Sequence, residues 1–178
     1  MQHDPAKRQD PNWLHQHLYN QADEVLGVDI DEEGIGSLRS AGFNVGLADA
    51  EKLDIDGTFD YVVAGELIEH LANPGKFLQA AEAKLGAEGR LISTTPNPWC
   101  WPRLKQLVYS GEVQCNPEHT HYHDRRTLRQ LLKRYGFETE IRFVGPMSEG
   151  IRRRLYRTPV ARLKRLGATQ LLAIAEQE

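Results

Sequence analysis

Three acidic residues follow apolar runs at positions where β-strands are expected to end. They are Asp29, Asp49 and Glu66. In a parallel sheet flanked by helices, ligands bind at the carboxyl ends of the strands. A carboxylate at such an end can accept hydrogen bonds from both hydroxyls of a ribose, and a neighbouring one can accept from an adenine amino group. We therefore predict a nucleoside site at Asp29 and Asp49. The alternative is that these acids cap the helices that follow.

A second group of chemically capable residues lies in the loop-rich segment 97–124. His119, His121 and His123 alternate along the chain, and Asp124 follows them. On an extended segment the three imidazoles would share one face, an arrangement that suits a metal ion. Trp99 lies upstream in the same segment, together with Trp101, and both could wall a pocket, although ordinary packing explains them equally well.

The elements that would position these residues alternate between strands and helices. Expected strands cover 24–30, 44–48, 59–64, 90–95, 137–144 and 169–175, and expected helices cover 11–21, 31–42, 73–86, 101–109, 127–135 and 151–166. Short buried strands that alternate with helices predict an α/β fold with a mostly parallel sheet and right-handed crossovers.

Length and composition indicate one domain, residues 1–178, without a membrane span. No apolar run approaches the ~20 residues that a transmembrane helix needs, and the polar residues 1–20 hold no secretory signal. Cys100 and Cys115 form no CxxC pair, so we expect reduced thiols and a cytoplasmic protein.

The charge is distributed unevenly along the chain. Residues 1–60 carry 13 acids and 4 bases, whereas residues 103–178 carry 15 bases and 8 acids. Seven of these bases lie in the segment 151–166, from Arg152 to Arg165. They could contact an anionic surface or form a solvated helix face. Tyr156 is the one aromatic residue among them, which falls short of the repeated aromatic interleaving of single-strand binders, so we do not expect a nucleic-acid partner.

With these elements in place, the central part of the chain resembles a class I S-adenosylmethionine-dependent methyltransferase. The matching segments, in order and correctly spaced, are 25–30, 48–51, 59–71 and 85–96, and segments 118–121 and 131–137 resemble the region between the family's fifth and sixth strands in members that act on small molecules, lipids or sugars. The resemblance implies a Rossmann-like, mostly parallel sheet with an antiparallel C-terminal strand. It also implies that segments 97–124 and 145–168 are substrate-side insertions.

The resemblance assigns roles to particular residues. The implied cofactor is S-adenosylmethionine, and the implied contacts are Asp29, Ile30, Asp49, Ala50, Glu51 and Gly65. Glu66 would stand where the methyl acceptor approaches, so we predict that it acts as base or orienting group, with His119 and then His121 as second candidates. His70 is expected to pack and form hydrogen bonds. The resemblance places the loop histidines in a lid without metal, so no metal is expected.

The sequence departs from the family at its start. The family begins with a strand and a glycine loop of the D/E-x-G-x-G-x-G type, and none precedes Glu24. The helix around Trp13 matches the element after that loop, so we interpret residues 1–23 as a remnant of the loop and first helix, with residues 2–4 from the loop. Three explanations are open. The natural product starts upstream, which we favour; or strand 24–30 pairs with 59–64; or another chain fills the gap.

These observations predict methyl transfer to a small-molecule, sugar or lipid acceptor, with activity lowered if the glycine loop is absent. A methyltransferase-like binding domain without catalysis is the alternative. A nicotinamide dehydrogenase also ends its second strand in an acid, but it needs a glycine fingerprint of its own, and its usual catalytic groups are not recognisable here. The sequence indicates neither the acceptor nor the oligomeric state.

Overall fold

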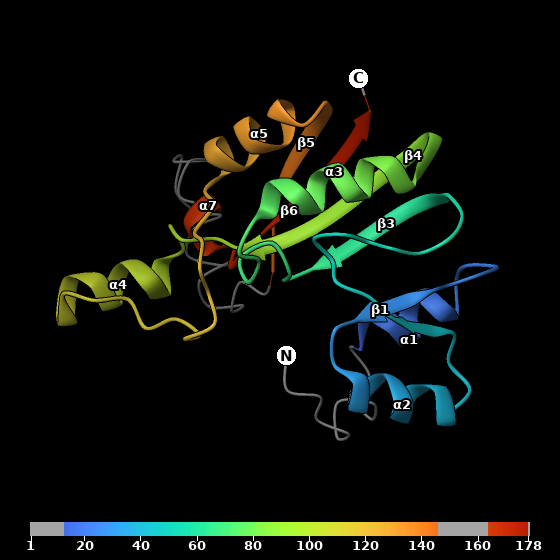
Figure 1. Ribbon diagram of the computed structural model, residues 1–178. Coiled ribbons are helices and arrows are strands. Elements are labelled where there is room, and N and C mark those ends of the chain that lie inside the picture. The colour runs from blue at the N-terminus through green and yellow to red at the C-terminus, as the bar shows by residue number, and fades with distance from the viewer. Residues whose placement is uncertain (1–12, 146–163, 178) are drawn as a thin grey trace. The chain divides into compact units, whose positions relative to one another are not determined.

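The computed structural model describes residues 13–145 and 164–177 (Figure 1). Its elements in chain order are α1 (Leu14–Tyr19), β1 (Gly27–Asp29), α2 (Glu32–Ser40), β2 (Val45–Leu47), β3 (Phe59–Gly65), α3 (Pro74–Lys84), β4 (Leu85–Pro96), α4 (Trp101–Ser110), α5 (Arg125–Arg134), β5 (Phe137–Val144), α7 (Lys164–Gly167) and β6 (Gln170–Gln177). The expected loop remnant at 2–4 and the basic helix, apart from its end in α7, lie outside the described residues.

The chain divides into two compact units, residues 1–57 and 58–178. In the first unit, β1 and β2 form a parallel pair in which Asp29 stands opposite Leu47. Helix α2 connects the two strands and packs Ile35 and Leu38 against Val45, with the rings of Trp13 and Phe43 at the border of this small core. The unit therefore has the strand–helix–strand form that the sequence predicted.

The second unit holds a four-stranded sheet in the order β3-β4-β6-β5. Strand β3 runs parallel to β4, while β6 runs antiparallel to both β4 and β5. The expected antiparallel C-terminal strand is confirmed. Within the described residues of each unit, β1 pairs with β2, and β3 pairs with β4.

Helix ends in the second unit follow local capping chemistry. Asn73 accepts a hydrogen bond from the backbone N–H of Lys76 at the start of α3, as its Asn-Pro sequence predicts. Asp124 accepts from the backbone N–H groups of Arg126 and Thr127 and forms a capping box at the start of α5. That cap begins the helix two residues earlier than its apolar pattern indicated.

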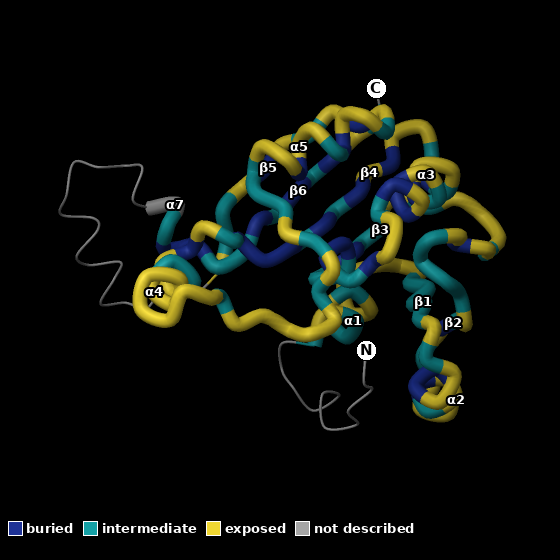
Figure 2. Tube along the Cα trace, turned by 60° about the vertical axis from the view of Figure 1, so that its left-hand side comes forward, coloured by how far each residue is buried: buried dark blue, intermediate teal, exposed yellow. Residues whose placement is uncertain are grey.

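The main difference from expectation concerns the end of α3. The helix ends at Lys84, and β4 begins at once with Leu85, whereas the sequence pattern predicted a strand from Arg90. Gly86 and Gly89 lie within the strand, where the pairing register with β3 shifts. A side chain at Gly89 would meet the Gly86 backbone, so this irregular start needs glycine. Figure 2 shows that buried positions gather along β4 and β6, the centre of this sheet.

Candidate functional site

The first unit brings Asp29 and Asp49 to the same edge of its sheet. Asp29 is the last residue of β1, and its backbone oxygen accepts from the N–H of Ala48 at 3.0 Å, just beyond the end of β2. Asp49 follows Ala48 directly. The two acids thus lie on neighbouring parallel strand ends, which is the placement that a nucleoside site requires.

Both carboxylates are held by their own turns. Asp29 Oδ1 accepts from the backbone N–H of Asp31 at 3.0 Å, and Asp49 Oδ1 accepts from that of Glu51 at 2.9 Å. The second oxygen of Asp49 lies 3.4 Å from Lys52 Nζ. No hydrogen bond to the second oxygen of Asp29 is formed by the described residues. A ribose hydroxyl could therefore donate to it without displacing a protein donor, so Asp29 fits the predicted contact.

The neighbours of these acids also suit a flat apolar group. Ile30 leaves 68% of its surface exposed although it adjoins a strand end, while Ala50 and Glu51 are half-buried in the turn after β2. An exposed isoleucine beside two ordered carboxylates offers apolar surface to a base. Asp31, the N-cap residue of α2, makes no side-chain cap bond to that helix.

In the second unit Glu66 follows β3 directly in a left-handed backbone conformation, φ +50°. Its N–H donates to both the backbone oxygen and the Oγ1 of Thr94 at 3.1 Å, which holds this uncommon conformation in place. Burial, and then the nearby Glu69 carboxylate, raise the pKa of Glu66. Its buried Oε1 has no hydrogen-bond partner. Gly65, the last residue of β3, pairs with Thr94.

His119 lies against the turn that follows Glu66. Its ring packs edge-on to that of His70, with centroids 4.6 Å apart. Burial, followed by the charges of His70 and Arg103, lowers the pKa of His119, so the imidazole is neutral over a wider pH range. The other two alternating histidines, His121 and His123, stack with each other at 5.8 Å. The three imidazoles therefore do not converge on one point.

A pocket of about 320 Å³ opens on the same unit. It is lined by Pro98, Trp99, Arg103, Val113, Tyr122, Asp124 and Thr127. Trp99 is half-exposed, and its indole N–H donates to Asp124 at 3.3 Å, while the Arg103 guanidinium stacks over Tyr122 at 5.3 Å. Trp99 thus lines this pocket, and Trp101 is not among its lining residues.

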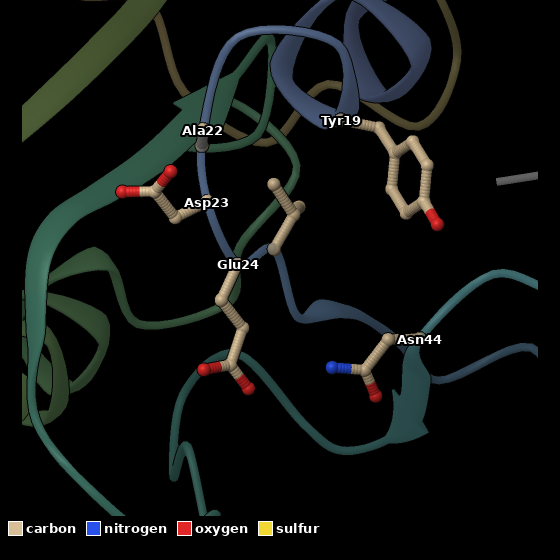
Figure 3. A pocket seen from close by; sticks show the side chains of 6 residues that line it. Tyr19, Ala22, Asp23, Glu24 and Asn44 are labelled. Carbon is tan, nitrogen blue, oxygen red and sulfur yellow. The ribbon is translucent and has the colours of Figure 1, made fainter.

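A second hollow, about 330 Å³, lies in the first unit between Tyr19, Asp23, Glu24 and Asn44 (Figure 3). These residues precede β1 and β2, so the hollow is at the amino ends of the strands. Asp29 and Asp49 follow the carboxyl ends. This hollow is therefore not the predicted nucleoside site.

Sequence reasoning missed Glu69, Arg103 and Tyr122. Glu69 is almost fully buried, and the charge of Arg103 acts on Glu66, Glu69 and His119. The spacing of Glu66, Glu69 and His70 within one turn was a readable signal. Nothing in the sequence connected Arg103 with these residues.

Among the described helices, none combines the length and apolar character needed to cross a bilayer. Cys100 is buried and Cys115 exposed, and both are free thiols.

Comparison with known proteins supports the same family. The chain is 27% identical over 124 residues to a probable S-adenosylmethionine-dependent methyltransferase of Mycolicibacterium smegmatis, covering 67% of this chain and 45% of that protein. A probable S-adenosylmethionine-dependent methyltransferase of Mycobacterium tuberculosis is 29% identical over 121 residues, with 65% of this chain and 41% of that protein covered. The chain thus spans less than half the length of these curated relatives.

Solved structures share the fold. A SAM-dependent methyltransferase from Archaeoglobus fulgidus superposes with a TM-score of 0.68 at 22% identity, covering 91% of this chain and 80% of that one. An S-adenosylmethionine-dependent methyltransferase from Mesorhizobium loti gives 0.61 at 21% identity, covering 93% and 84%. A family model described as a methyltransferase domain matches residues 10–140, more than half of the chain. The chain therefore belongs to the methyltransferase-domain family, as its resemblance to class I S-adenosylmethionine-dependent methyltransferases predicted.

Proposed function

We propose that this chain is part of an S-adenosylmethionine-dependent methyltransferase that acts on a small-molecule, sugar or lipid acceptor. The observation that carries the proposal is the placement of Asp29 and Asp49 at the carboxyl ends of paired parallel strands. Family membership and the fold of the solved relatives support it.

In this proposal the first unit recognises the adenosine. Asp29 accepts hydrogen bonds from the ribose hydroxyls, Asp49 and the turn at Ala50 and Glu51 stand beside the base, and Ile30 covers its face. Bound S-adenosylmethionine supplies an electrophilic methyl group on a sulfonium, so the protein mainly has to position the acceptor.

The second unit supplies the acceptor side. Glu66 and Gly65 stand at the end of β3, and the raised pKa of Glu66 suits a group that takes a proton from an acceptor as its methylation begins. His119, neutral over a wider pH range, is the second candidate. The pocket of Trp99, Arg103 and Tyr122 suits a flat or anionic acceptor, because it pairs aromatic surface with a guanidinium.

Calorimetric titration of the chain with S-adenosylhomocysteine tests the cofactor assignment. We expect saturable binding that Asp29→Asn weakens by about 10–100-fold, since a hydrogen bond to a charged group contributes about 1.5–3 kcal/mol. Asparagine can still accept from the Asp31 N–H. Asp23→Asn is the matched control, because it removes the same charge from the opposite ends of the strands. Equal weakening by both variants, or no binding by the unsubstituted chain, contradicts the proposal.

Catalysis is separated from binding by a second assay. Radiolabelled S-adenosylmethionine is incubated with the chain and a panel of phenolic, carboxylic, sugar and lipid acceptors. We expect transfer that Glu66→Gln reduces while leaving the affinity for S-adenosylhomocysteine unchanged. Binding without transfer to any acceptor would instead favour the non-catalytic binding domain.

A further inference from the structure

Three potential metal ligands converge in the second unit, outside the predicted nucleoside site. One carboxylate oxygen of Glu69, one ring nitrogen of His70 and one ring nitrogen of His119 all lie within 4.8 Å of one another. Glu69 and His70 belong to the turn between β3 and α3, whereas His119 comes from the loop before α5. Residues about 50 positions apart thus supply one compact set of donors, which spacing along the chain does not predict.

Burial sets this cluster apart from an exposed acidic patch. Glu69 exposes only 1% of its surface. One of its oxygens, Oε2, accepts from the Thr95 hydroxyl at 3.0 Å, but the buried Oε1 has no hydrogen-bond partner. The Nδ1 of His119 is also buried and has no partner. A buried polar atom without a hydrogen-bond partner raises the free energy of the folded state, and a bound ligand would remove that penalty.

The backbone holds the two segments together without help from an ion. The backbone oxygen of Glu69 accepts hydrogen bonds from the backbone N–H of Thr120 at 2.8 Å and from that of His121 at 3.2 Å. The Thr120 hydroxyl donates to Leu71 O at 2.8 Å. The donor set is therefore preorganised, and a bound ion does not have to order the loop.

The surrounding charges favour a cation. Glu118 Oε2 lies 4.0 Å from His70 Nδ1. Glu66 is also near, because burial and then the Glu69 carboxylate raise its pKa. Arg103 is the opposing charge. Three acidic side chains and one guanidinium thus lie around the cluster, and burial raises the pKa of Glu66 and Glu69. Imidazole nitrogens bind metals in their neutral form.

We propose that Glu69, His70 and His119 bind a divalent ion of the first transition row, such as Mn²⁺, Co²⁺ or Zn²⁺. One carboxylate with two imidazoles is a donor set suited to these ions rather than to Ca²⁺. Three protein ligands leave coordination positions for water or another oxygen ligand. The proposal differs from the sequence-based expectation of no metal, and metal binding is measured without methyl transfer.

Titration of the chelator-treated chain with Co²⁺, Mn²⁺ and Zn²⁺ tests the site. We expect one equivalent to bind, with a Co²⁺ absorption spectrum typical of nitrogen and oxygen ligands and a raised melting temperature. His119→Ala and Glu69→Gln should each weaken binding by more than the about 10–100-fold that supporting residues cost. Glu69→Gln keeps an oxygen that can accept from Thr95.

The matched control is His121→Ala, which removes an imidazole from the same loop but not from the donor set. Binding in this variant should stay within about twofold of the unsubstituted chain. Circular dichroism without metal shows whether each variant is folded, and the metal-induced rise in melting temperature should disappear only in the donor variants. No saturable binding of any of the three ions, or equal loss in His119→Ala and His121→Ala, overturns the proposal.

Discussion

The two units differ in how their sheets are built. The first contains a single pair of three-residue strands and a core of Ile35, Leu38 and Val45. The second contains four strands of seven to twelve residues, and its sheet buries Leu91, Leu171 and further side chains completely. A two-stranded sheet is marginally stable by itself. The half that carries the predicted nucleoside contacts is therefore the half with less buried apolar surface.

This difference suggests how the halves respond to ligands and substitutions. Local opening is easier where few apolar groups are buried. A ligand that binds only the folded state stabilises it by mass action. We therefore expect S-adenosylhomocysteine to slow amide exchange chiefly around β1 and β2, and core substitutions to cost more in the second unit than in the first.

The largest effect is expected in the second unit for Phe77→Ala. Phe77 is 2% exposed on α3. Truncation of a buried phenylalanine costs about 3–5 kcal/mol, and denaturant unfolding followed by circular dichroism measures the loss. Val108→Ala, at an 80% exposed position, is the control with little expected change. A loss of less than about 1 kcal/mol in the free energy of unfolding for Phe77→Ala would show that the core of the second unit is loosely packed around this side chain.

Leu38→Ala should affect the first unit at the lower end of the range for buried leucine, about 2–3 kcal/mol. Leu38 is 8% exposed and belongs to a small cluster that can collapse around the lost atoms. Hydrogen exchange with mass spectrometry should show faster exchange in β1 and β2 and unchanged exchange in β4 and β6. Equal acceleration in both regions would mean that the units unfold as one.

Glycine substitutions in two helices should have opposite signs. A Cβ at Gly75, in the first turn of α3, would collide with the ring and hydroxyl of Tyr135. The ring must move, so we expect Gly75→Ala to destabilise the second unit by about 1–3 kcal/mol. Thermal unfolding measures the change, and an unchanged midpoint would show that Tyr135 can be displaced freely.

The caps of α5 and α2 offer a smaller contrast. Asp124→Ala should cost about 0.5–2 kcal/mol, whereas Asp31→Ala should cost little, because Asp31 makes no side-chain cap bond. Bonds from the Thr127 backbone, with further help from Trp99, lower the pKa of Asp124. Its stabilising contribution is thus complete above the ordinary pKa of about 4 and is lost as pH falls through the lowered value. Unfolding of both variants at neutral and acidic pH checks this.

The smallest effect is expected for Gly36→Ala in α2. A Cβ at this exposed position meets no atom within 4 Å. Alanine should therefore stabilise the first unit by about 0.5–1 kcal/mol through helix propensity and the unfolded state. Slower amide exchange in α2 is the measurement. Destabilisation would indicate that this face of α2 has a packing role.

Local signals in the sequence located most elements correctly. The strand Phe137–Val144 was predicted with its observed ends, and Asn73-Pro74 marked the start of α3. The start of β4 was misplaced, because Gly86 and Gly89 usually end an element but here occupy an irregular strand next to β3. Such a position depends on the neighbouring strand, which no local pattern contains.

By itself, the sequence determined which residues end strands and which cap helices, because apolar runs and capping groups act over a few positions. It thereby placed Asp29, Asp49 and Glu66 correctly at strand ends. Only the tertiary structure decided that Glu69 and His70 meet His119, and that His121 and His123 do not join them. Convergence of distant segments is set by how chains pack, since hydrogen bonds from Thr120 to the Glu69 turn fix the loop's position.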